Sequence, residues 1–175
     1  MELLLGCGKS RVKKLVYGGR SEWAALTTLD HEPRHEPDVV WDMNVLPLPF
    51  GDDTFDEIHA YECLEHCGRQ GHAQFFFGQF ADFWRILKPD GVLLATVPAP
   101  DSPWAWGDPS HTRIIHPASL TFLSQPNYDA QIGVTAMSDF RSIYQADFDL
   151  IHSQVDGDTF AFVLRAVKPS RITRD

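Results

Sequence analysis

The sequence has few cysteines and no long apolar run, and each shortage excludes a class of protein. Three cysteines among 175 residues are too few, and odd in number, for a domain held together by disulfides. No apolar run approaches the roughly 18 residues that cross a bilayer, and the first residues lack the pattern of a signal peptide. We therefore expect one domain over residues 1–175, with reduced thiols, in the cytoplasm.

Basic residues are also scarce, with 15 Lys and Arg against 24 Asp and Glu and a net charge of −9. Non-specific nucleic-acid binding needs many basic contacts to phosphate, so nucleic acid is not the expected partner. Five basic residues within residues 9–20 leave open a local basic face, as in a nucleic-acid-modifying enzyme. The acidic stretch 30–65 suits a cationic or hydroxyl-rich ligand, or is a solvated acidic surface.

The hydrophobic pattern predicts an α/β fold without repeats or linkers. Short apolar runs followed by glycine or acidic turns indicate strands, and a three-to-four-residue apolar spacing over 72–87 indicates an amphipathic helix. Because strand, helix and buried strand follow one another, we expect a mostly parallel sheet that closes with an antiparallel hairpin. The region 128–145 has no clear pattern. The predicted strands are 2–5, 23–29, 38–41, 55–61 and 91–97, with the hairpin strands at 148–155 and 159–167.

A glycine-rich turn follows the first predicted strand. Gly6-Cys7-Gly8 leaves backbone N–H groups free and lets a ligand approach the chain closely. Asp30 ends the next strand, where a carboxylate can accept both hydroxyls of a ribose. No GxxxxGK[ST] phosphate loop is present, so nucleoside triphosphate chemistry is not expected.

Several segments together resemble the class I S-adenosylmethionine-dependent methyltransferases. The resemblance implies a Rossmann-like, doubly wound sheet and S-adenosylmethionine as cofactor. The matching segments are Leu3-Leu4-Leu5-Gly6-Cys7-Gly8, Asp30, Asp42 with Leu46-Pro47-Leu48-Pro49-Phe50, Phe55-Asp56-Glu57-Ile58, Leu64-Glu65-His66 and Arg85-Ile86-Leu87-Lys88-Pro89-Asp90-Gly91.

The resemblance also implies roles for single residues in cofactor binding. Gly6, Cys7 and Gly8 would line the methionine part, and Asp30 would hold the ribose hydroxyls. Asp42 and Met43 would face the adenine, whereas Tyr61 and Glu62 would border the sulfonium. An acidic, aromatic-lined pocket suits the positive charges of this cofactor. For Tyr61, packing at the strand end is the alternative.

Two positions depart from the family pattern. Leu4 stands where an acidic residue is usual, and Ser10 replaces the third glycine. The sequence also reaches its first strand at once, so we expect the loop around Trp104 and Trp106, or a partner subunit in a homodimer, to cover the pocket. A second hypothesis follows: a catalytically inactive methyltransferase-like module that acts through a protein partner.

The long loop after the fifth predicted strand supplies the candidate catalytic residues. His111 is the expected base and Asp108 its orienting partner, although loop histidines are often structural. The expected reaction is O- or N-methylation of a small or medium polar acceptor. The DNA amino-methyltransferase signature is missing after the fourth strand, which disfavours DNA base methylation.

A cluster of possible metal ligands follows the fourth predicted strand. It contains Cys63, His66, Cys67 and His72, but it lacks the paired CxxC spacing of zinc sites. We therefore expect no metal and interpret the segment as a short helix with buried thiols and with His66 facing the active site.

Overall fold

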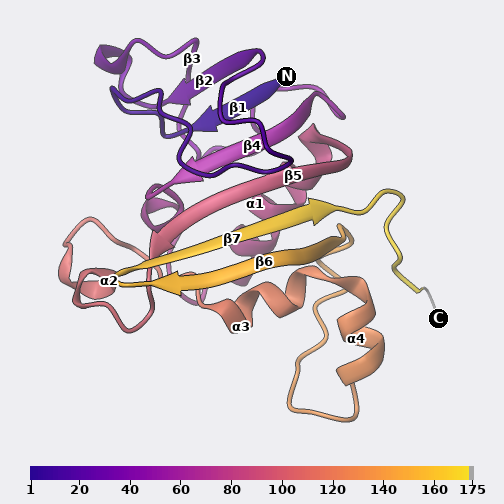
Figure 1. Cartoon of the computed structure of the whole chain (residues 1–175). Helices are drawn as coiled ribbons and strands as arrows, with labels where there is room; N and C mark the ends of the chain where they lie inside the picture. Colours follow the sequence, from indigo (N-terminus) through magenta and orange to yellow (C-terminus); the bar gives the residue numbers. More distant parts are fainter. Residues whose placement is uncertain (174–175) are drawn as a thin grey trace.

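The computed structural model describes residues 1–173 and contains a seven-stranded sheet in the order β3-β2-β1-β4-β5-β7-β6 (Figure 1). The first five strands are parallel, and β7 pairs antiparallel with both β5 and β6. This confirms the predicted mostly parallel Rossmann-like sheet with its terminal hairpin. The strands are β1 (Glu2–Leu5), β2 (Leu26–Asp30), β3 (Val39–Val40), β4 (Phe55–Tyr61), β5 (Leu87–Pro98), β6 (Phe148–Asp156) and β7 (Thr159–Ala166).

Helices cover one face of the sheet. The apolar stripe of α1 (Ala73–Ile86) buries Phe77, Phe80 and Phe83 in the main hydrophobic core, as its spacing predicts. The shorter helices follow β5 in the chain. They are α2 (Pro103–Gly107), α3 (Pro117–Leu120), the 3₁₀ turn η3 (Thr121–Leu123) and α4 (Gln125–Gln131). None of the helices in residues 1–173 is long and apolar enough to cross a membrane.

The region without a clear sequence pattern is anchored by two buried tyrosines. Tyr128 lies in α4 and Tyr144 in the loop before β6, and both are fully buried. Their hydroxyls donate to the carbonyl oxygens of Phe122 and Leu123, at 2.9 and 3.1 Å. Because tyrosines and not a regular series of aliphatic residues fill this part of the core, the apolar spacing of the sequence does not reveal it.

The opposite face of the sheet is covered by an extended segment, residues 9–25, and not by a helix (Figure 1). Leu15 and Trp23 pack against a small apolar cluster on this face. Lys13 enters it with only 1% of its side chain exposed, and its Nζ lies 2.8 Å from Glu57 and 3.2 Å from Glu2. Lys13 is therefore folded onto the sheet, whereas Lys9, Lys14 and Arg20 are exposed.

Glu57 also anchors a chain of hydrogen bonds through His59 to Tyr61. The Tyr61 hydroxyl accepts backbone N–H bonds from Lys14 and Leu15, so it donates its own proton to His59 Nδ1, 2.6 Å away. His59 Nε2 then donates to Glu57 at 2.9 Å. Burial lowers the pKa of His59, in keeping with this neutral tautomer.

Replacing Lys13 by Met tests the buried ion pairs. The variant leaves the buried Glu2 and the partly buried Glu57 without their cation, which should lower the free energy of unfolding by about 3 kcal/mol. Urea unfolding followed by circular dichroism measures this loss. Lys9→Met, at an exposed position of the same segment, should change stability by less than about 0.5 kcal/mol. Equal effects of the two variants would contradict the account.

The pH dependence of stability tests Glu57 separately. Burial opposes its ionisation, but hydrogen bonds from Lys13 and His59 outweigh this, so its pKa lies below the ordinary value of 4.5. The unfolded state then binds more protons, and the contribution of Glu57 is present above about pH 4.5 and lost as pH falls further. Glu57→Gln should lose less stability than the unmodified protein between about pH 6 and pH 3. Parallel curves would refute this assignment.

Candidate functional site

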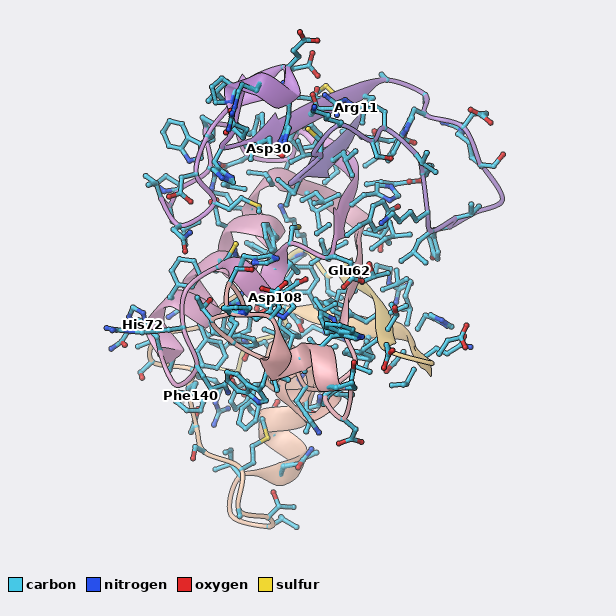
Figure 2. The ribbon with its side chains drawn as sticks, turned by 90° about the vertical axis from the view of Figure 1, so that its left-hand side faces the viewer. Arg11, Asp30, Glu62, His72, Asp108 and Phe140 are labelled. Atoms are coloured by element: carbon cyan, nitrogen blue, oxygen red, sulfur yellow. The ribbon has the colours of Figure 1, made fainter. Side chains whose placement is uncertain are left out.

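A cavity of about 550 Å³ opens at the carboxyl edge of the parallel strands. Figure 2 looks onto this edge, with Asp30 and Glu62 both on it. A volume of this size lies within the range of small-molecule sites. Six of the eight residues expected to bind cofactor line this first cavity, namely Gly6, Gly8, Asp30, Asp42, Met43 and Glu62.

The glycine-rich turn is held against the end of β2. Gly8 donates its N–H to Asp30 Oδ2 at 2.8 Å, and Glu32 donates its N–H to Oδ1 at 2.9 Å. Burial opposes ionisation of Asp30, but these two bonds and the nearby His35 outweigh it, so the pKa of Asp30 lies below its ordinary value. His35 Nδ1 also lies 3.3 Å from Oδ2, so Oδ1 is the oxygen with a lone pair left for a ligand hydroxyl.

Two backbone conformations shape the same edge. Gly6 has a φ of +55°, and a Cβ there would lie 2.7 Å from the Cβ of Cys63, so only glycine fits. Glu62, directly after β4, has a φ of +50°, which is uncommon for a residue other than glycine. Strained residues of this kind cluster at functional sites. The Glu62 side chain lines the cavity and is exposed.

Cys7 and Tyr61, also expected at the cofactor, do not line the cavity. Both are buried in the apolar cluster beneath residues 9–25, together with Leu4. The Tyr61 hydroxyl is engaged by His59 and two backbone N–H groups. Packing at the strand end, the alternative considered for Tyr61, therefore describes its position.

Sequence reasoning did not assign several residues that line the first cavity. All but Leu29 and Ser110 follow the end of β2, β3 or β4, so their position at strand ends is the signal that could have found them. They are Leu29, His31, His35, Trp41, Asn44, Cys63, Cys67 and Ser110. His66, which the sequence interpretation turns toward the active site, also lines this cavity.

A second cavity, of about 400 Å³, adjoins the first and shares Glu62 and His66 with it. Its lining includes both residues expected in catalysis, His111 and Asp108, as well as Trp104. Trp104 and Trp106 are each about 60% exposed, and Trp106 does not line the cavity. The full lining is Glu62, Glu65, His66, Pro98, Trp104, Asp108, His111, Asp158 and Thr159.

His111 is held by a backbone carbonyl and not by Asp108. Its Nδ1 lies 3.4 Å from the carbonyl oxygen of Ala105, whereas Asp108 Oδ2 is 3.8 Å from Nε2. The other Asp108 oxygen accepts the backbone N–H and hydroxyl of Ser110, and these bonds lower the Asp108 pKa. Glu65 lies beside His111, and burial raises the pKa of Glu65 to about 8.

The cysteines of the candidate zinc cluster are engaged with the backbone. Cys63 donates its thiol to the Leu5 carbonyl and Cys67 to the Cys63 carbonyl, at 3.7 and 3.5 Å. Burial raises the pKa of both thiols. His72 stacks on Phe75 at the start of α1. The segment between them contains the predicted short helix, a 3₁₀ turn over Leu64–His66.

The two departures from the family pattern lie outside both cavities. Leu4 is buried on the sheet face under residues 9–25, and Ser10 is an exposed residue of that segment. Neither substitution changes the residues that line either cavity.

Comparison with known proteins identifies the family. Residues 3–95, more than half of the chain, match the family model of a methyltransferase domain. No curated protein matches the sequence. Among solved structures, the chain is similar to an S-adenosylmethionine-dependent methyltransferase from Archaeoglobus fulgidus. The two are 12% identical, with 94% of this chain and 85% of that chain covered and a TM-score of 0.55.

Two further solved structures share the fold. One is the 1,6-didemethyltoxoflavin-N1-methyltransferase of Burkholderia thailandensis with bound substrate and S-adenosylhomocysteine, at 16% identity, 95% and 71% coverage and a TM-score of 0.54. The other is a methyltransferase in complex with the Trm112 activator of Haloferax volcanii, at 16% identity, 95% and 82% coverage and a TM-score of 0.51. The chain therefore belongs to the methyltransferase-domain family and is a class I, S-adenosylmethionine-dependent methyltransferase.

Proposed function

We propose that this chain methylates an oxygen or nitrogen atom of a small or medium polar acceptor that binds in the second cavity. The observation that carries the proposal is the junction of the two cavities at Glu62 and His66. A cofactor in the first cavity and an acceptor in the second would meet there. Residues 1–175 would form one catalytic domain, and its three unpaired thiols suit the reducing cytoplasm.

The residues of the first cavity fit S-adenosylmethionine. Asp30 Oδ1 offers a lone pair for a ribose hydroxyl, and Asp42 with Met43 would face the adenine. The carboxylate of Glu62 suits the positive charges of the cofactor's methionine part, and Gly6 and Gly8 allow close approach of that part. When bound, this cofactor supplies an activated methyl group on a sulfonium.

The chain itself contributes alignment of the two reactants and removal of a proton. Holding the two reactants in line supplies much of the lowering of the barrier in a displacement at carbon. His111 is the proposed base, because its Nδ1–H is held by the Ala105 carbonyl and its Nε2 carries the free lone pair. Asp108, 3.8 Å from Nε2, would stabilise the protonated imidazole and not orient the neutral one.

The acceptor that we propose is a polar small molecule. The second cavity carries the acidic residues Glu62, Asp108 and Asp158 and the indole of Trp104, a lining that suits hydroxyl and amine groups. Substrate-bound 1,6-didemethyltoxoflavin-N1-methyltransferase, which shares the fold, is consistent with an acceptor of this size.

A protein partner is a second element of the proposal. Trp104 and Trp106 are exposed beside the second cavity, and either a second copy of the chain or another protein could cover them. The fold relative in complex with the Trm112 activator shows that this fold can work with a partner protein. We favour an active enzyme over a binding module, because neither Leu4 nor Ser10 lines a cavity.

Replacing Asp30 by Ala tests the cofactor site. The variant loses charged hydrogen bonds, and affinity for S-adenosylhomocysteine should fall by about 10- to 100-fold in calorimetric titration. Glu22→Ala removes an exposed acid of the segment over the opposite sheet face and should leave the affinity unchanged. Equal affinities of the unmodified protein and Asp30→Ala would refute this placement of the cofactor.

Replacing His111 by Ala tests the catalytic site. Transfer of labelled methyl groups to a panel of hydroxyl and amine acceptors should show turnover by the unmodified protein. The variant should be slower by about 10²- to 10⁴-fold at unchanged S-adenosylhomocysteine affinity. His152→Ala, on exposed β6, serves as the control. No turnover with any acceptor would favour the inactive module.

A further inference from the structure

Three side chains at the junction of the two cavities turn their acceptor atoms toward one another. Glu65 Oε1 lies 3.9 Å from His66 Nε2 and 4.0 Å from His111 Nε2. The two imidazole rings meet edge to face at 4.7 Å between centroids. All three donor atoms lie within 4.8 Å of one another, close enough for a single ion between them.

The hydrogen bonds of the two histidines fix which nitrogen carries the lone pair. His66 Nδ1 lies 3.2 Å from the Ser110 carbonyl oxygen, and His111 Nδ1 lies 3.4 Å from the Ala105 carbonyl oxygen. A carbonyl only accepts, so each Nδ1 carries the proton and each Nε2 is left with its lone pair toward Glu65. Metal-binding histidines are oriented by carbonyls in the same way.

One oxygen of the Glu65 carboxyl group lacks a hydrogen-bond partner. Its side chain is 3% exposed, and its Oε2 is buried without a hydrogen-bond donor among the residues that the structure describes. The neighbouring Arg113 donates instead to the Leu64 carbonyl and to Gln79. Burying such a group without a partner is costly, and a cation between the three side chains would remove that cost.

We propose that Glu65, His66 and His111 bind a divalent transition-metal ion. Two imidazoles and a carboxylate favour Zn²⁺ or Mn²⁺ over Mg²⁺ and Ca²⁺, which prefer oxygen ligands. This ligand set contains no cysteine, unlike the cluster considered from the sequence. The proposal also replaces the expectation that the chain binds no metal. It would lie where both cavities meet.

The position of the ion also points to a hydroxyl-bearing acceptor, a step that rests on the proposed methyl transfer. A bound divalent cation lowers the pKa of a nearby hydroxyl. The hydroxyl proton passes to solvent, the acceptor oxygen bonds to the methyl carbon, and the carbon–sulfur bond breaks with its electron pair left on sulfur. In the ion-bound protein His111 Nε2 is a metal ligand, and the ion takes over the activation of the hydroxyl that we assign to His111 as base in the metal-free site.

Metal binding is measured on the full chain after removal of bound ions with a chelator. Calorimetric titration and elemental analysis should show one Zn²⁺ or Mn²⁺ per chain, bound at least about 10-fold more tightly than Mg²⁺. His66→Ala, His111→Ala and Glu65→Gln should each weaken binding by more than about 10-fold. Circular dichroism confirms that each variant is folded.

Two control variants separate this site from other histidines and from the cofactor site. His152→Ala, on exposed β6, and Asp30→Ala should bind the ion as tightly as the unmodified protein. Absence of a stoichiometric ion, or equal loss of affinity in His152→Ala, would overturn the metal site.

The metal-free and metal-loaded preparations also show whether the ion takes part in methyl transfer or whether the chain transfers no methyl group at all. Methylation of hydroxyl acceptors should fall at least about 10-fold in metal-free protein and return on addition of Zn²⁺ or Mn²⁺. Turnover that is equal with and without the ion would overturn its role while leaving the methyltransferase proposal intact. A bound ion with no turnover by any preparation would support the metal site and overturn the proposed function.

Discussion

The parallel pairing of β1 with both β2 and β4 is the constraint on which the site depends. Leu5 pairs with Leu29 on one side and with Ala60 on the other, so the three strands end at one edge. The residues at and after these ends are therefore brought together by the strand pairing. Gly6, Asp30 and Glu62 become neighbours for this reason, and the Gly8–Asp30 hydrogen bond closes the turn over the cavity.

The opposite sheet face shows how the fold is completed without a helix between β1 and β2. Residues 9–25 cover part of that face as an extended segment, and the buried Lys13 binds it to Glu2 and Glu57. Arg11 connects the same segment to the first cavity, since it donates to the carbonyls of Gly8 and His35, which line that cavity. Stability on one face and geometry at the cavity are therefore linked through residues 9–25.

Much of the fold follows from the sequence pattern. The strand over 55–61 agrees with the prediction at both ends, and the helix over 72–87 agrees within one residue, because apolar periodicity dominates both segments. The sequence did not reveal the region around Tyr128 and Tyr144, because no apolar period announces these buried residues and the Tyr144 hydroxyl contacts Leu123, 21 residues earlier.

The sequence predicts those site residues that lie at a strand end. Asp30 is the last residue of β2, and Glu62 directly follows β4. Tyr61 was harder to place, because the motif does not say toward which face of the sheet its side chain points. The grouping of Glu65 with His111 depends on the loop after β5, whose path no local pattern specifies. The most direct test of the central claim is calorimetric titration of the purified chain with S-adenosylmethionine and S-adenosylhomocysteine, with NAD as the control. The account predicts micromolar binding of the first two and none of NAD, whereas no binding of either would contradict a functional cofactor site.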